Sequence, residues 1–369
     1  MTPAGTPDGA ELPLLYGPWI EALLGGAVPA EAAASCDRCA MLAQPGSRTD
    51  GDLFFDPRSK CCTYVPSLPN FLVGRILRDR SPESAAGRAS VEARIEAGVG
   101  VTPAGLAQPP VYGLRYRSAA DAFGRSVALR CPHYLADTGT CGIWRHREAA
   151  CATWFCKYDR GAVGLRFWTA LRRLLESIER SLVAHCVLAL DPGVGAIERL
   201  VASPRPDADP RLSATDLDEV ADAHRQRLAW GRYAGREREF YEASARLVEN
   251  LTWSEVTRLT GAEVRLAATP VKATYDALRS DALPSRLRVA PVEITPLGAD
   301  RLRMTSYRAY DPLVIPKALG DALHHFDGRP TRSALAAIAR DNGLDVERAV
   351  VRRLVDFDVL IEDPAEPSE

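Results

Sequence analysis

The feature that most constrains the fold of this chain is the uneven distribution of its cysteines. Eight of the nine lie between residues 36 and 156, and the ninth is Cys186. This clustering predicts a cysteine-rich N-terminal module over residues 1–160 that differs in organisation from the rest of the chain. The eight form two groups in the sequence, Cys36, Cys39, Cys61 and Cys62, then Cys131, Cys141, Cys151 and Cys156.

The setting of these thiols bears on their chemistry. The N-terminal sequence lacks a basic segment followed by an apolar one, so it does not resemble a signal peptide. The longest apolar run, at 182–190, is much shorter than the ~20 residues that a membrane span needs. We therefore expect a cytoplasmic protein without a membrane association, in which the thiols stay reduced and form no disulfide framework. The formal net charge of −2 provides no general attraction to nucleic acid.

The spacing of the cysteines favours metal ligation over burial in a core. Cys36 and Cys39 form a CxxC pair, which lets two thiolates reach one ion. Eight thiols match two four-coordinate sites, or one cluster plus one ion. We predict that all eight are ligands of zinc or iron, with an iron–sulfur cluster as one form of the iron site, because spacing does not select the metal. The alternative is packing as small hydrophobes, and we assign that role to Cys186.

Basic and aromatic residues flank the cysteines. Positive charge offsets the charge of a thiolate site and favours ionised thiols, and large apolar side chains exclude water from it. His133 and His146 lie close by in the sequence and are alternatives to a thiolate ligand, although we favour exposed or supporting positions for them. The cations are Arg38, Lys60, Arg130, Arg145, Arg147 and Lys157, and the aromatic residues are Trp144, Trp154, Phe155 and Tyr158.

The cysteine pattern resembles that of the YkgJ-like cysteine-cluster proteins, which are described as zinc- or iron-chelating domains. The resemblance covers residues 36–158 and implies that the same eight cysteines bind the metal. The chain departs from the family pattern in a longer gap between CxxC and CC, and in Glu148, where a proline is usual. The matching segments are CDRC at 36–39, KCC at 60–62, RCPHYL at 130–135 and CGIWRHREAAC at 141–151, followed by Cys156.

Beyond the cysteines the pattern becomes helical, and we expect a helical region over residues 161–282. Two helices are predicted within 214–250 and another reaching about 280, whereas 203–213 is rich in Pro and Asp and predicts a linker. The first and longest helix is predicted from apolar residues that share one face, namely Leu165, Trp168, Leu171, Leu174, Leu175, Ile178 and Leu182.

The C-terminal part alternates between strand and helix signals. Residues 286–307 predict a hairpin around Gly298, three short helices follow from near Pro316, Thr331 and Asp345, and 358–362 predicts a strand. This order resembles a winged helix or the small peptide-binding PqqD-like domain, which implies a protein or peptide partner. We expect this domain over 283–362 and a disordered tail over 363–369. The fold class predicted for the whole chain is α+β and mostly helical.

Three functions follow from these patterns. The favoured one is a metal-binding protein that holds zinc or iron through two cysteine quartets. The second is an iron–sulfur-dependent enzyme that modifies a protein or peptide, implied by the similar cysteine cluster of FliB-type flagellin lysine methylases, which use S-adenosylmethionine. The segment VLALDPGVG at 187–195 is partly like a methyltransferase nucleotide loop, but we interpret it as a helix ending in a turn.

The third function is a metal-sensing DNA-binding regulator, suggested by Arg348, Arg352 and Arg353, although neighbouring carboxylates argue against a phosphate-binding face. No catalytic residue is predicted.

Overall fold

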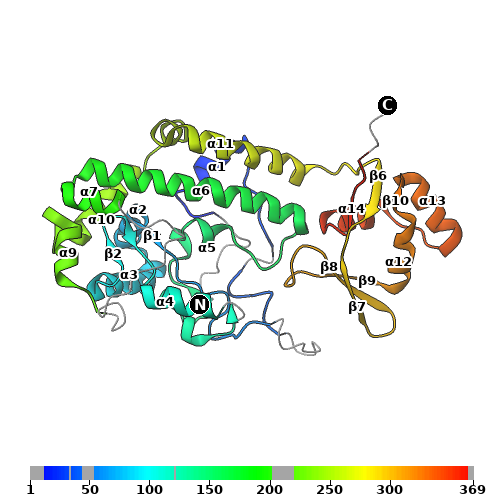
Figure 1. Ribbon diagram of the computed structural model, residues 1–369, viewed down its shortest axis with the longest axis horizontal. Coiled ribbons are helices and arrows are strands. Elements are labelled where there is room, and N and C mark those ends of the chain that lie inside the picture. The colour runs from blue at the N-terminus through cyan, green and yellow to red at the C-terminus, as the bar shows by residue number, and fades with distance from the viewer. Residues whose placement is uncertain (1–11, 33–34, 44–53, 120–121, 202–219, 365–369) are drawn as a thin grey trace. The chain divides into compact units, whose positions relative to one another are not determined.

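The computed structural model describes residues 12–32, 35–43, 54–119, 122–201 and 220–364. The fold is mixed α+β, about 53% helical, with small antiparallel sheets (Figure 1). The chain forms two compact units, the first from residues 1–154 and 171–270, the second from 155–170 and 271–369. The predicted linker at 203–213 and residues 365–369 of the predicted tail lie outside the described residues.

Helices form most of the first unit. The long helix predicted from residue 165 onward is confirmed as α6 (Gly161–Leu190), and Leu171, Leu174 and Ile178 are fully buried along its apolar face. None of the described helices combines the length and apolar character needed to span a membrane. The other helices are α1 (Gly17–Leu24), α2 (Asn70–Arg78), α3 (Ala85–Ala97), α4 (Pro110–Ser118), α5 (Ala149–Thr153), α7 (Val194–Val201), α9 (Ala223–Trp230), α10 (Glu237–Val248) and α11 (Trp253–Arg279). Residues 161–170 of α6 and 271–279 of α11 belong to the second unit. There are 3-10 turns at Pro82–Ser84, Val127–Leu129, Trp144–His146 and Gly231–Tyr233.

The core of the first unit forms where α2 crosses α10. A Cβ atom on Gly74 would lie 1.8 Å from the carbonyl oxygen of Tyr241, so only glycine allows the two backbones to approach this closely. Trp230 and Phe240 pack edge to face beside this crossing, with their ring centroids 5.5 Å apart. The crossing brings residues far apart in the sequence into one apolar core that includes Leu77, Val91 and Val187.

Two small sheets complete the first unit. Strands β1 (Leu68–Pro69), β3 (Gly105–Leu106) and β2 (Val101–Thr102) pair in that order, and β4 (Tyr134–Leu135) pairs with β5 (Thr140–Cys141). The prediction of a strand at 126–131 is wrong, because Val127–Leu129 forms a 3-10 turn. Its apolar residues contribute to a small core instead, where Leu129 and Cys131 pack with Val65 and Tyr112.

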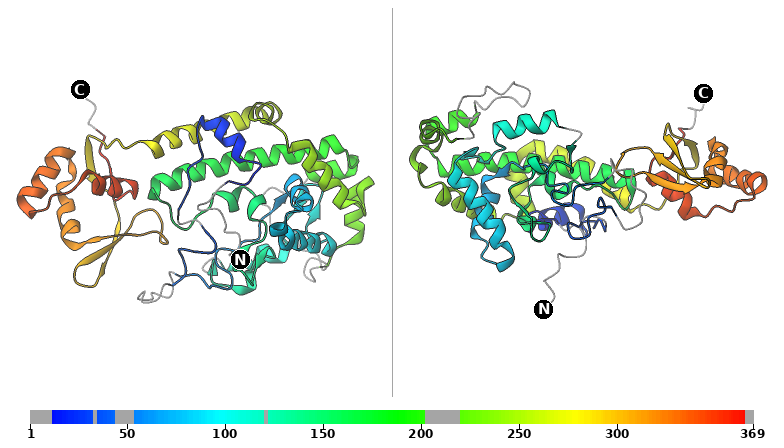
Figure 2. Two further views of the ribbon diagram at one scale, coloured as in Figure 1. Left: turned by 180° about the vertical axis from the view of Figure 1, so that it is seen from behind. Right: turned by 90° about the horizontal axis from the view of Figure 1, so that it is seen from below.

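The second unit has two three-stranded antiparallel sheets. One has the order β10 (Asp327–Pro330), β6 (Arg286–Val289), β11 (Leu360–Glu362), and the other the order β7 (Glu293–Leu297), β8 (Arg301–Thr305), β9 (Leu313–Pro316). Gly298 has a φ of 73° between β7 and β8, which confirms the predicted hairpin. Its helices are α12 (Lys317–Ala322), α13 (Thr331–Asn342) and α14 (Arg348–Asp356), with a 3-10 turn at Leu323–His325 (Figure 2). The third helix begins after Glu347 rather than at the predicted Asp345.

A buried ion network joins three segments of the second unit. Asp356 is 5% exposed, and its two carboxylate oxygens accept hydrogen bonds from Arg160 at 2.6 and 2.8 Å. The Nε atom of Arg352 donates to the same carboxylate at 2.9 Å. Arg160 also donates to the carbonyl oxygen of Leu278, at the end of α11. The network therefore fixes residues 155–170 to both α11 and α14.

Replacing Asp356 by asparagine is expected to lower the free energy of unfolding by about 2 kcal/mol, because charge-assisted hydrogen bonds to two arginines are weakened in a buried site. The measurement is chemical denaturation of the full chain. The matched control is Asp358→Asn, since Asp358 pairs with Arg166 at a more exposed position and the loss there should stay below about 0.5 kcal/mol. Equal effects of the two variants would show that the buried network contributes no more than a surface pair.

Candidate metal centre

Seven of the eight predicted ligands lie in the first unit and form one electrostatic network. Cys62 connects the two sequence groups, because its thiol interacts with Cys61 as well as with Cys141 and Cys131. Across the groups, the charge of Cys36 also raises the pKa of Cys141. The structure therefore brings the two groups together rather than keeping them as separate quartets. The members of this thiol cluster are Cys36, Cys39, Cys61, Cys62, Cys131, Cys141 and Cys151.

Backbone contacts explain how distant cysteines meet. The N–H of Cys131 donates to the carbonyl oxygen of Cys62 at 2.7 Å, which joins the KCC segment to the second group. Cys141 is placed by the β4–β5 hairpin, where it pairs with Tyr134. The ammonium of Lys60, only 7% exposed, donates to the carbonyl oxygens of Cys36 and Gly139. Lys60 therefore ties the CxxC segment to the hairpin and places a positive charge beside the cluster.

Arg147 is the second cation of the cluster. It is 4% exposed, and its guanidinium interacts with Cys141, Cys36, Cys151 and Cys61. Its position is fixed by hydrogen bonds to backbone oxygens and by stacking, since its Cζ atom lies 3.4 Å from the ring centroid of Trp144. A buried guanidinium among thiols favours their ionised form and offsets the negative charge that they acquire on binding a metal.

The thiols themselves are poorly solvated. Burial, with a contribution from neighbouring thiols, raises the pKa of Cys131 and of Cys141 to about 12. Burial and Cys61 likewise raise the pKa of Cys36 to about 12. Cys61 differs, because a hydrogen bond from Cys62 lowers its pKa despite burial. Most of the cluster is therefore protonated without a bound cation, and a metal ion would displace protons as it binds.

The donor chemistry of the cluster suits a thiophilic metal, since thiolates select zinc, copper(I) and iron–sulfur clusters over magnesium or calcium. As the side chains stand, no three His, Cys, Asp or Glu residues within the described ranges converge closely enough to hold one ion. Ligation by these thiols therefore requires their side chains to turn toward a common point.

The remaining predicted site residues occupy other surroundings. Cys156 belongs to the second unit and is half-buried. Cys186 is fully buried on α6, with its Sγ atom 3.7 Å from the carbonyl oxygen of Ser244, as expected for a packing role. His133 bonds through Nδ1 to the hydroxyl of Ser90 at 2.8 Å. His146 bonds through Nε2 to Asp79 at 2.8 Å.

The aromatic residues predicted to exclude water from the metal site lie in different environments. Trp144 covers Arg147 as described above. Trp154 packs edge to face on Phe123, with ring centroids 5.0 Å apart, in the first unit. Phe155 and Tyr158 belong to the second unit, where their ring centroids lie 5.9 Å apart.

Comparison with known proteins gives no assignment. No family model, curated protein or solved structure matches this chain.

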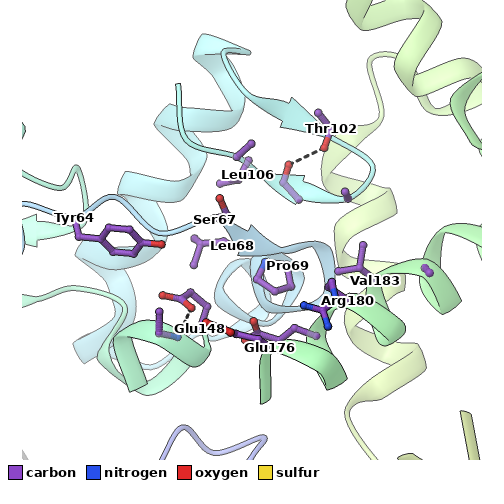
Figure 3. Close-up of a pocket in the computed structure, with 16 residues that line it drawn as sticks. Tyr64, Ser67, Leu68, Pro69, Thr102, Leu106, Glu148, Glu176, Arg180 and Val183 are labelled. Carbon is purple, nitrogen blue, oxygen red and sulfur yellow. Dashed lines mark hydrogen bonds between the residues drawn. The ribbon is translucent and has the colours of Figure 1, made fainter. Parts of the chain in front are cut away.

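A cavity of about 530 Å³ lies beside the cluster in the first unit. The link between the two is Glu148, which caps α5: its Oε1 atom accepts the N–H of Cys151 at 2.9 Å, and its side chain also lines the cavity. Figure 3 shows Glu148 and Glu176 next to each other at one edge of this space, with Tyr64 and Arg180 toward opposite ends of it.

Sequence reasoning did not predict this cavity. Two signals for it were present. Glu148 stands where the resembled family usually has a proline, and Glu179 lies among the apolar residues of the buried face of α6. A carboxylate on such a face needs a specific partner, because an unpaired buried charge is costly. Neither residue identifies the cavity without the other, since they come from separate elements.

Proposed function

We propose that this protein binds zinc or iron through its cysteine cluster, with an iron–sulfur cluster as one form of the iron site. The observation that carries the proposal is the interaction of four thiols, those of Cys36, Cys61, Cys141 and Cys151, with the buried guanidinium of Arg147. Structural cysteines packed as hydrophobes would need no buried cation beside them. The proposed ligands are drawn from Cys36, Cys39, Cys61, Cys62, Cys131, Cys141 and Cys151, with Cys156 retained from the sequence pattern.

Different residues of the cluster would have different roles in holding the metal. The thiols supply the ligands, and Arg147 and Lys60 supply compensating charge. Trp144 shields the guanidinium on one face. A bound zinc ion would cross-link the loops of the module, whereas an iron–sulfur cluster would add electron transfer. We further propose that the second unit engages a protein or peptide partner, as its resemblance to a PqqD-like domain implies.

Analysis of metal and acid-labile sulfide, with a visible absorbance spectrum, tests the metal proposal on full-length protein purified without oxygen. We expect zinc without colour, or iron with sulfide and visible absorbance. Protein that carries no metal under these conditions, and takes up neither zinc nor iron when they are added, would contradict the proposal. The two positive results separate a structural or binding role from a redox or catalytic one.

A second candidate is an enzyme that acts on a protein or peptide, and it is favoured by the cavity beside the cluster. Glu148 contacts both, so a substrate in the cavity would lie next to the metal-binding residues. S-adenosylmethionine is the cofactor implied by the FliB-type resemblance. Residues 187–190 form the last turn of α6 rather than the strand that precedes a methyltransferase nucleotide loop. Calorimetric titration with S-adenosylmethionine tests this candidate, and iron-containing protein that does not bind it would exclude the methylase form.

Two of the three arginines that suggested DNA binding are engaged by other groups of the second unit. Arg352 donates to Asp356 and to the carbonyl oxygen of Ala282, and Arg348 donates to the carbonyl oxygen of Asp281. These arginines thus have partners within the second unit.

A further inference from the structure

The cavity beside the thiol cluster combines an acidic end with an apolar wall. Its acidic residues are Glu148, Glu176 and Glu179, and its apolar residues include Leu68 and Val183. Glu148 and Glu179 are 5% and 8% exposed, so both carboxylates are largely withdrawn from bulk water. Such a combination of a few convergent polar groups with apolar walls is typical of small-molecule sites.

The arginine that lines this cavity is already engaged elsewhere. Arg180 pairs with Glu263, with 2.5 Å between Nη2 and Oε1, and also donates to Ser177. Glu176 has a long contact of 3.4 Å with Arg172 along the exposed side of α6. Neither arginine pairs with Glu148 or Glu179 among the contacts of the described residues.

Glu179 leaves one oxygen available to a ligand. Its Oε1 atom accepts the hydroxyl of Tyr16 at 2.5 Å and the N–H of Ala149 at 2.8 Å. Its Oε2 atom accepts no hydrogen bond from the described residues, although the side chain lines the cavity. Burial, with a contribution from Glu148, raises the pKa of Glu179, so this carboxyl group binds a proton unless a cation takes its place.

We propose that this cavity binds a small alkylammonium ion, with its charged nitrogen at Glu179 and its neighbouring carboxylates and its aliphatic chain along Leu68 and Val183. A carboxylate or phosphate ligand would be repelled by the three glutamates. An ammonium group offers three donors that can reach separated oxygens, and its chain covers the apolar wall.

This inference goes beyond metal binding and requires neither a metal nor a reaction. Metal content is measured separately on the same protein, so failure of one proposal leaves the other standing. If the protein is an enzyme, the inference names the charged group of its substrate.

The test uses three probes of similar size on the full chain, namely n-pentylammonium, n-pentanol and n-pentanoate, titrated by calorimetry or followed by protein NMR. We expect only the ammonium ion to bind. Glu179→Gln should weaken its affinity roughly tenfold, because a charge-assisted hydrogen bond is replaced by a neutral one. The amide oxygen of glutamine can still accept hydrogen bonds from the hydroxyl of Tyr16 and the N–H of Ala149, so the variant should fold.

Two further variants complete the test. Glu176→Gln is also expected to weaken the affinity for the ammonium ion. This variant provides the test if Glu179→Gln does not fold. Glu242→Gln is the matched control, because Glu242 pairs with Arg238 on α10 and does not line the cavity. Equal binding of pentanol and pentylammonium, unchanged affinity in both cavity variants, or no binding of the ammonium ion would overturn the proposal.

Discussion

Replacing Cys141 by serine is expected to release bound metal and to lower the free energy of unfolding by about 4 kcal/mol or more, the scale associated with loss of a metal site. Cys141 interacts with thiols of both sequence groups, including Cys36, Cys61 and Cys131. Serine is nearly isosteric but binds zinc and iron weakly. Because metal binding in such sites is largely folding free energy, metal content and stability should fall together. Metal analysis and chemical denaturation of the same samples provide the measurement.

Cys186→Ser is the matched control for this substitution. Cys186 is as deeply buried as any cysteine of the chain, but it packs on α6 against Ser244 rather than against other thiols. The control should lose some stability from a changed core contact and should keep its metal. If Cys141→Ser also kept a full complement of metal, the assignment of the thiol cluster as the metal site would be wrong.

The second large effect is expected for Arg147→Met, which removes the buried charge while keeping a long side chain. We expect metal affinity to fall and the metal-loaded protein to lose about 3 kcal/mol of stability, as for removal of one partner from a buried ion pair. The metal-free protein should lose less, because its thiols are mostly protonated and need no counter-charge. Denaturation of loaded and metal-stripped protein measures the difference between the two losses.

Two controls define the role of the guanidinium. Arg145→Gln alters an exposed neighbour in the same turn and should leave metal affinity unchanged. Arg147→Lys keeps the charge but loses the planar group that stacks on Trp144 and bonds to two backbone oxygens. Equal losses of stability in the loaded and metal-free forms of Arg147→Met would indicate that these packing contacts, and not the charge, explain the effect.

Regular elements with a clear apolar period could be predicted from the sequence. The buried stripe of α6, the hairpin at Gly298 and the helix that ends at Gly343 each depend on local signals, namely a helical repeat or a glycine in the left-handed region. The prediction of a strand at 126–131 failed because a strand forms only where it pairs with a neighbouring strand. The backbone N–H of Cys131 pairs with Cys62 of a distant loop instead.

The candidate site was predictable only in part, for a related reason. The cysteines and the nearby cations are visible in the sequence, and the buried Arg147 and Lys60 were among the residues singled out there. That Cys62 lies near Cys131 and Cys141 depends on how two loops fold together. The cavity needs Glu148 from the start of α5 and Glu179 from α6. No local pattern contains such pairs of distant residues, so the structure was needed to show them.

The interleaved composition of the two units has a consequence for how the chain folds as it is synthesised. The second unit takes residues 155–170 from the middle of the chain, where Phe167 and Trp168 are fully buried, and Phe167 packs against Tyr275 of α11. Phe167 leaves the ribosome about a hundred residues before Tyr275. Domains normally fold as units in the order of synthesis. Here the cysteine segments are complete early, but the second unit cannot close until the last helix has been made, and a fragment beginning at residue 271 would lack part of its own core.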